Sequence, residues 1–324
     1  MYFNYLNDNY VLRDYMMKCS ISPGKILLFG EHFVVKGKPA LGLAVSMYVN
    51  VCVEHGSWAI YSKQLGLIDQ GSKHRVLFNA LIEKINQDYT KVPPLNIYVD
   101  SKLPIASGMG SSAAIAVATA HAILSYLNVP FTKEDVWKIA HEAEKTVHYK
   151  PSGVDTILAT YGGFLYYRQG SFRRLDLKLP GNISFIIVNS RVERSTGEVV
   201  KDVLSRYERL GVISEHIYNA GEKIVEKALE ALEKSDVSTI GELMLVNHGL
   251  LWAMGASSEV CDRIVYELIK IGALGGKISG AGRGGIVIGL IDNAKLNLAR
   301  EVLSGKNYEF YIVTPDYIGV RSFK

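Results

Sequence analysis

The sequence has few cysteines, and they lie far apart. Cys19, Cys52 and Cys261 include no Cys-x-x-Cys pair, which excludes a zinc ribbon. An odd number of widely spaced cysteines also argues against a disulfide framework. We therefore expect three buried free thiols.

Long apolar runs are also absent. No stretch approaches the roughly 20 residues needed to span a bilayer. The opening residues, MYFNYLNDNYVLRDYMMKC, carry Asp, Asn and Arg throughout and resemble no secretory signal. We expect a cytoplasmic protein with no membrane partner. Met16 and Met17 raise the alternative that the natural start lies there, with the preceding residues an extension.

The chain lacks a strong charge of either sign. Its formal charge is +4 over 324 residues, with no dense Lys/Arg stripe, which argues against a nucleic-acid partner. The tightest basic cluster, Arg173, Arg174 and Lys178, is typical of a solvated strand surface. No repeat of fixed period is present. The length predicts two domains or one large one.

The periodicity predicts an α+β protein. Strands are expected within 19–29 and 43–54 and at 95–99, and helices at about 111–127 and from Thr132, where Asp135 completes a variant capping box. Beyond a strand at 183–189 the pattern is mainly helical, with a few strands. We place the domain boundary there, giving domains 1–182 and 183–324.

The stretch SGMGSSAA at 107–114 is a candidate phosphate loop. Gly108 and Gly110 let the backbone curl around a ligand, and Ser111 and Ser112 begin the Ala-rich helix. The first N–H groups of a helix have no internal acceptor and attract anions. The alternative is a glycine turn with serine caps. The loop matches neither a Walker nor a Rossmann pattern.

A second glycine loop, KISGAGRGG, occupies 277–285. Glycines this dense cost conformational entropy unless the backbone must approach something, although a tight turn explains them equally well. Two such loops in separate halves of the chain suggest a site at a domain interface.

Ionisable side chains lie between and before these loops. Glu144 and His148 share a helix face, and Asp155 follows in PSGVDTILATYGG. Lys25 enters an apolar strand, where a lysine is seldom buried unless paired, and pairing with Asp155 would keep that carboxylate ionised. The alternatives are a solvated Glu144, a helix-capping Asp155 and a snorkelling Lys25.

Three stretches, SPGKILLFGEHFVVKGKPAL, PIASGMGSSAA and KISGAGRGG, resemble in order the three motifs of the GHMP kinase superfamily. The resemblance runs from about Lys18 to the C-terminal strands. Within the superfamily the sequence is most similar to the mevalonate kinases, on Gly-Glu-His at 30–32, HYKPSGVDT at 148–156 and RST at 194–196. A galactokinase would continue with Thr-Asp, whereas Phe33 and Val34 follow here.

The resemblance implies the two-domain GHMP kinase fold, with an N-terminal domain like domain 2 of ribosomal protein S5 and a ferredoxin-like C-terminal domain. It implies ATP and Mg²⁺ as cofactors, mevalonate as the small-molecule substrate, and phosphorylation of its 5-hydroxyl. The implied catalytic residues are Asp155 and Lys25. The implied ATP-binding residues are Pro104, Ser107, Gly108, Gly110, Ser111, Ser112, Ala113, Gly280 and Gly282. The implied metal ligands are Ser112, with Ser111 as the alternative, and Glu144. The implied substrate residues are Glu31, His32, His148, Arg194 and Thr196.

Three positions depart from the family pattern: Phe33, Lys150 and Arg283. Lys150 or Arg283 would suit a substrate that already carries phosphate, so a phosphomevalonate kinase or another GHMP kinase is the alternative. A non-enzymatic protein of this fold that binds a metabolite or nucleic acid has no need of Lys25, Glu144 and Asp155 together. A helical C-terminal half would support a homodimer.

Overall fold

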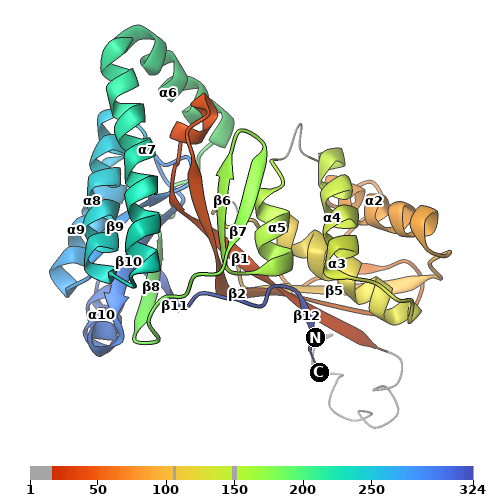
Figure 1. The fold of residues 1–324 in the computed structure, drawn as a ribbon. Helices are drawn as coiled ribbons and strands as arrows, with labels where there is room; N and C mark the ends of the chain where they lie inside the picture. The colour runs from red at the N-terminus through yellow and green to blue at the C-terminus, as the bar shows by residue number, and fades with distance from the viewer. Residues whose placement is uncertain (1–16, 105–106, 148–151, 324) are drawn as a thin grey trace.

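The computed structural model describes residues 17–104, 107–147 and 152–323, and Figure 1 shows two domains side by side. His148 and Lys150, which the sequence singled out, lie outside the described residues. None of the described helices is long and apolar enough to cross a membrane.

The first domain is a sheet covered by helices on one face (Figure 1). Its strands run in the order β12-β1-β2-β5-β3-β4, with β6 on β2 and β7 on β6. The strands are β1 (Lys18–Phe29), β2 (Ala40–His55), β3 (Ile60–Ser62), β4 (Gly66–Leu67), β5 (Leu95–Ser101), β6 (Phe164–Arg168), β7 (Ser171–Leu175) and β12 (Arg321–Ser322). The helices are α2 (Lys73–Asp88), α3 (Ser111–Leu127), α4 (Lys133–Val147) and α5 (Val154–Tyr161).

Alternating side chains fix which sheet face meets the helices. In the second half of β2, Val49, Val51 and Val53 are buried, whereas the residues between them are partly exposed. This period of two is typical of a sheet with one covered face. The predicted capping box is confirmed, because the Thr132 N–H donates to Asp135 Oδ2 (2.8 Å) and the Asp135 N–H donates to Thr132 Oγ1 (3.2 Å).

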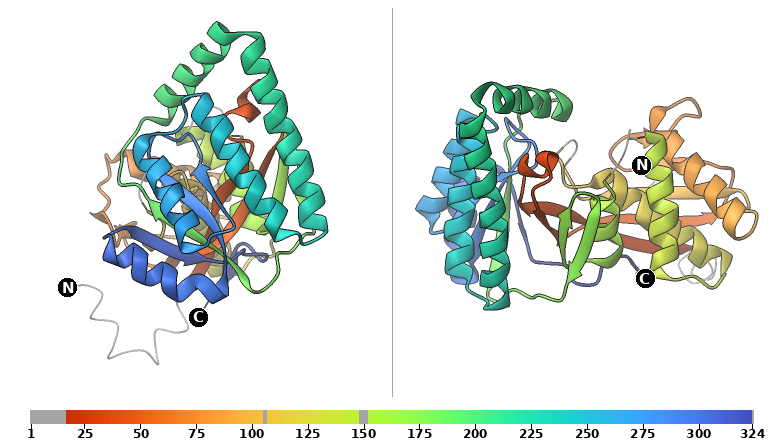
Figure 2. Two further views of the ribbon diagram at one scale, coloured as in Figure 1. Left: turned by 90° about the vertical axis from the view of Figure 1, so that its left-hand side faces the viewer. Right: turned by 45° about the horizontal axis from the view of Figure 1, so that its top comes forward.

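The second domain is an antiparallel sheet in the order β11-β8-β10-β9, with helices around it (Figure 2). The strands are β8 (Ile183–Asn189), β9 (Gly275–Ser279), β10 (Ile286–Asp292) and β11 (Glu309–Val313). The helices are α6 (Thr196–Leu210), α7 (Val212–Glu233), α8 (Val237–Ala253), α9 (Glu259–Ile271) and α10 (Leu296–Gly305), with 3₁₀ turns η2 (Phe33–Lys36) and η3 (Asn293–Lys295). The periodicity did not predict α2, α6 or β9. After β11 the chain returns to the first sheet as β12, and the boundary near 183 stays a prediction.

The end of β1 joins the two domains. Leu27 on β1 exchanges two hydrogen bonds with the Ser279 hydroxyl on β9: the Leu27 N–H donates to it (2.9 Å) and it donates to the Leu27 carbonyl (3.0 Å). The largest cluster of buried apolar side chains is continuous across this joint, from Leu28 in the first domain to Phe185 and Ile288 in the second. The two glycine loops lie close together beside this interface, because a Cβ added to Gly285 would be 3.4 Å from the Ser107 carbonyl oxygen.

The expectation of three free thiols is wrong for two cysteines. Cys19 on β1 and Cys52 on β2 are directly opposite in the antiparallel register, with Cα atoms 4.1 Å apart, and form a disulfide. Cys261 is free and buried, as expected. The error has a physical reason: strand register brings together two cysteines that are 33 residues apart, and cysteine spacing alone does not report register.

Candidate active site

The loop at 107–110 is tied to β1 beside the start of α3. The Lys25 N–H donates to the Met109 carbonyl (3.0 Å), and the Ser107 hydroxyl donates to the Pro104 carbonyl (2.7 Å). Gly110 is the N-cap of α3, with φ of 74°, and no side chain caps the helix. The N–H groups of Ser111 and Ser112 thus begin a 17-residue helix with no side-chain acceptor from the cap, which suits an anion.

Lys25 and Asp155 meet at this loop. Lys25 Nζ is 3.2 Å from Asp155 Oδ1, and their side chains are 14% and 40% exposed. A Cβ on Gly110 would lie 3.2 Å from Lys25 Cγ and 3.5 Å from Asp155 Oδ2. Glycine at this position lets the loop backbone approach both charged side chains. The structure therefore brings together the two residues that the sequence proposed as catalytic.

Ser112 and Glu144 form a second polar pair at the start of α3. The Ser112 hydroxyl donates to Glu144 Oε1 (2.5 Å), and Glu144 is only 5% exposed although it is ionisable. Hydroxyl and carboxylate oxygens are ligands that Mg²⁺ accepts, commonly together with substrate phosphates. Among the described residues no group of three or more His, Cys, Asp or Glu forms a metal site. Mg²⁺ usually keeps several waters and binds only one or two protein ligands, so this pair of oxygens is compatible with it.

Arg194 lies between the two glycine loops. A Cβ added to Gly108 would be 3.6 Å from Arg194 Nη2, and one added to Gly280 would be 3.7 Å from it. Arg194 Nη1 donates to the Thr196 hydroxyl (2.7 Å) at the start of α6, which orients the guanidinium. Its Nε is buried without a hydrogen-bond partner among the described residues. A partly buried guanidinium with a spare donor between two loops is suited to an anionic ligand.

His32 connects the first domain to the second glycine loop. Its Nε2 donates to the Ala281 carbonyl (2.8 Å), and the residue is 5% exposed. Burial lowers the pKa of His32 from its usual value, and the neighbouring charges of Arg194 and Arg283 act in the same direction. A neutral ring that donates through Nε2 has Nδ1 as a hydrogen-bond acceptor.

Glu31 points into the protein. Its carboxylate pairs with Lys277 Nζ and accepts from Asn247 Nδ2 (3.3 Å), and the side chains of Glu31 and Lys277 are both fully buried. Burial lowers the pKa of Lys277, and Glu31 beside it opposes that shift. Sequence reasoning placed Glu31 in the substrate pocket and overlooked Lys277. A lysine in the buried strand GGKIS was the available signal, because such a lysine requires a partner.

Arg283 is held within the second domain. Its Nε donates to the Gly255 carbonyl (2.8 Å), and its Nη2 pairs with Asp202 on α6. The backbone at Arg283 has φ of 53°, and its N–H donates to the Ala256 carbonyl (2.8 Å). These contacts engage the side chain that the sequence analysis considered for a substrate already carrying phosphate.

Comparison with known proteins agrees with this fold. The GHMP kinases N terminal domain matches residues 76–163, and the GHMP kinases C terminal domain matches residues 228–309. Together these models match more than half of the chain and define its class, the GHMP kinases.

Individual proteins of similar sequence and structure identify the family within this class. The mevalonate kinase of Aeropyrum pernix is 38% identical, covering 86% of this chain and 90% of that protein, and the mevalonate kinase of Pyrococcus abyssi is 34% identical, covering 87% and 90%. The crystal structure of L. major mevalonate kinase in complex with R-mevalonate has a TM-score of 0.79 at 28% identity, covering 91% of this chain and 95% of that one. The chain belongs to the mevalonate kinase family.

Proposed function

We propose that the chain transfers the γ-phosphoryl group of ATP to the 5-hydroxyl of mevalonate, giving 5-phosphomevalonate and ADP. The observation that carries the proposal is the Lys25–Asp155 pair, held against the glycine loop at the start of α3. Phosphoryl transfer requires alignment of the reacting groups and neutralisation of charge, and this pair offers a base and a cation at one point.

Asp155 would orient the 5-hydroxyl and take its proton. The hydroxyl oxygen then forms a bond to the γ-phosphorus while the bond from that phosphorus to the β–γ bridging oxygen breaks, leaving ADP. Lys25 would hold the Asp155 carboxylate in place and offset negative charge on the transferred group. The first N–H groups of α3 and the loops at 107–110 and 280–285 would surround the phosphates.

Substrate contacts would come from His32 and Arg194. The His32 Nδ1 is suited to accept a hydrogen bond from a substrate hydroxyl, since Nε2 is committed to Ala281. The Arg194 guanidinium would bind the mevalonate carboxylate or a phosphate oxygen, and Thr196 would orient it. Glu31 would support His32 from the interior. His148, which the resemblance implies as a substrate residue, stays a prediction.

Ser112 and Glu144 would hold Mg²⁺. A bound Mg²⁺ offsets the charge of the phosphates and fixes their geometry. We expect Glu144→Gln to raise the Mg²⁺ concentration needed for half-maximal ATP binding, because it removes the only charged group of this pair. Mg²⁺ titration of nucleotide affinity, followed by fluorescence, measures the change. An unchanged titration would count against the assignment.

The alternative function, phosphomevalonate kinase, depended partly on Arg283 as a ligand for the substrate phosphate. The Arg283 guanidinium instead contacts Asp202 and the Gly255 carbonyl, which favours mevalonate. The proposal is tested by ADP release with mevalonate, phosphomevalonate, homoserine and galactose in parallel, with mass analysis of each product. We expect turnover with mevalonate and a single added phosphate. Turnover with phosphomevalonate alone would overturn the substrate assignment but leave the reaction class intact.

A further inference from the structure

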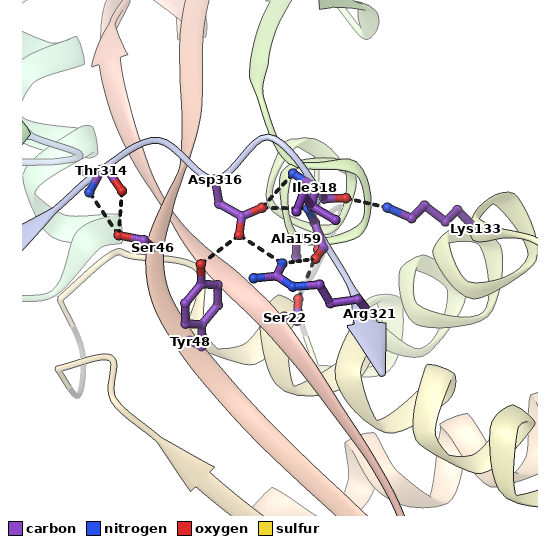
Figure 3. Close-up of polar contacts among 10 residues, drawn as sticks. Ser22, Ser46, Tyr48, Lys133, Ala159, Thr314, Asp316, Ile318 and Arg321 are labelled. Atoms are coloured by element: carbon purple, nitrogen blue, oxygen red, sulfur yellow. Dashed lines mark hydrogen bonds and ion pairs between the residues drawn. The ribbon is translucent and has the colours of Figure 1, made fainter. Parts of the chain in front are cut away.

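The C-terminal segment 314–322, called here the C-terminal tail, returns from the second domain to the first (Figures 1 and 3). It leaves β11 and first contacts β2, where the Ser46 N–H donates to the Thr314 carbonyl (2.8 Å) and the Thr314 N–H donates to the Ser46 hydroxyl (2.9 Å). It ends as β12, where Arg321 pairs with Ile21 of β1. The part between these anchors lies against α5.

Asp316 organises this middle part. It is 4% exposed, and both carboxylate oxygens are fully used. Oδ2 accepts from the Tyr48 hydroxyl (2.9 Å) and from Arg321 Nη1 (3.0 Å), and Oδ1 accepts from the N–H groups of Ile318 (2.9 Å) and Gly319 (2.6 Å) (Figure 3). A buried carboxylate with four donors fixes the turn at 316–319 firmly.

This turn holds the C-terminal end of α5. The Gly163 N–H donates to the Asp316 carbonyl (2.6 Å), and the Val320 N–H donates to the Thr160 carbonyl (3.1 Å). The approach is close: a Cβ added to Gly319 would be 2.2 Å from the Thr160 oxygen. From the other side, the Ser22 hydroxyl of β1 donates to the Ala159 carbonyl (3.0 Å). The tail and β1 thus pair with two of the carbonyls that the end of α5 leaves without a partner within the helix, those of Thr160 and Ala159.

Asp155 lies in the first turn at the other end of the same helix. A helix of eight residues has little stability of its own, so its position depends on what holds it. The tail contacts neither the glycine loop at 107–110 nor Lys25 in any hydrogen bond of the described residues. A change in the tail should therefore move Asp155 relative to Lys25 and the phosphate loop, without altering that loop directly.

We propose that the C-terminal tail, through Asp316, positions α5 and so places the Asp155 carboxylate for phosphoryl transfer. Asp316 is then a positioning residue that acts through Asp155. The inference rests on the proposed role of Asp155 as base, and the experiment separates the two.

The experiment is a double-mutant cycle on Asp316→Ala and Asp155→Asn, read out as single-turnover rates with the full-length chain. We expect Asp316→Ala alone to lower the rate about 10- to 100-fold, because small misplacement of a catalytic group has effects of this size. ATP affinity should change little. In the Asp155→Asn background the same change should have almost no further effect, since the group it places has lost its function.

Two further variants guard against loss of folding. Asp316→Asn keeps an oxygen for the Ile318 and Gly319 N–H groups and should recover part of the rate lost in Asp316→Ala. Tyr48→Phe removes one hydrogen bond and keeps the ring, and should lower the rate in the same direction by less. Thr314→Val is the matched control: it alters the tail where the tail contacts β2, and should lower the melting temperature slightly and leave the rate unchanged.

The outcomes are distinguishable. Asp155→Asn with a near-normal rate overturns the proposed base and leaves the tail without its target. A second outcome is that Asp155→Asn greatly lowers the single-turnover rate and Asp316→Ala lowers it by the same factor in the wild-type and Asp155→Asn backgrounds. This outcome would support Asp155 as the base but overturn the positioning role of Asp316. A wild-type rate in Tyr48→Phe and in folded Asp316→Ala overturns it as well.

Discussion

Two ion pairs involve residues only six positions apart, Lys25 on β1 and Glu31 just after it, but they differ in solvent exposure. Lys25 pairs with Asp155 at the glycine loop, where the Asp155 side chain is 40% exposed. Glu31 pairs with Lys277 where neither side chain has any exposure. A partly open pair can exchange its partner for a substrate group, whereas a fully buried pair can only hold two segments together. Similar chemistry thus leaves one ion pair able to contact a ligand and makes the other a buried connection between the domains.

The buried Glu31–Lys277 pair lies next to two segments of the candidate active site. Glu31 is followed directly by His32, which donates to the Ala281 carbonyl of the second glycine loop, and Lys277 on β9 is the first residue of the 277–285 stretch that forms this loop. The buried pair therefore fixes both segments that carry His32 and the loop at 280–285. The Lys25–Asp155 pair stays partly exposed, whereas the neighbouring Glu31–Lys277 pair is buried and connects the two domains.

The largest expected effect concerns the open pair. Asp155→Asn should lower kcat about 10²- to 10⁴-fold, the usual result of removing a general base. The free energy of unfolding should fall by less than about 1 kcal/mol, because the pair is partly exposed. Steady-state kinetics, ATP binding and urea unfolding on the same preparation measure both. If Asp155→Asn lowered the free energy of unfolding but not kcat, the Lys25–Asp155 pair would be structural, like the Glu31–Lys277 pair.

The buried pair should behave in the opposite way. Lys277→Met leaves Glu31 as an unpaired buried carboxylate and should lower the free energy of unfolding by about 3–5 kcal/mol. Glu31→Gln with Lys277→Met removes both charges, keeps an oxygen for Asn247, and should recover most of that loss. Urea unfolding measures each variant. If the double variant is as unstable as Lys277→Met, the unpaired charge is not the cause.

The smallest expected effect on the free energy of unfolding concerns an ion pair on the surface of the first domain. Lys84 and Asp88 form an i,i+4 pair on α2, 3.0 Å apart, with side chains 31% and 38% exposed. Asp88→Ala should change the free energy of unfolding by about 0.5 kcal/mol or less, and kcat not at all. The same urea and kinetic assays apply. A loss comparable to that of Lys277→Met would show that burial does not decide the strength of these pairs.

Much of the site could be predicted because its parts are local in sequence. The glycines of both loops, the helix at 111–127 and the capping box of Thr132 and Asp135 each depend on residues within a few positions of one another. Lys25, Glu144 and Asp155 were found from their chemistry and from the resemblance of three motifs. A cytoplasmic location and a homodimer, also expected from the sequence, stay predictions.

The features that could not be predicted from the sequence are contacts between segments that are far apart in the chain. Glu31 and Lys277 are separated by 246 positions, and Tyr48 and Asp316 by 268. The disulfide between Cys19 and Cys52 follows from the register of two strands. No local pattern reports such partners, so the inward direction of Glu31 and the role of Arg283 could not be read from their neighbours.

The sequence by itself determined the class of fold, the family and the residue types of the candidate site, because glycine loops, helix starts and apolar periodicity are short-range properties of the chain. Only the tertiary structure decided which charged residues stay partly exposed and which are fully buried. That choice is made by burial, since the cost of an isolated buried charge forces each one to find a partner that only the folded chain can supply.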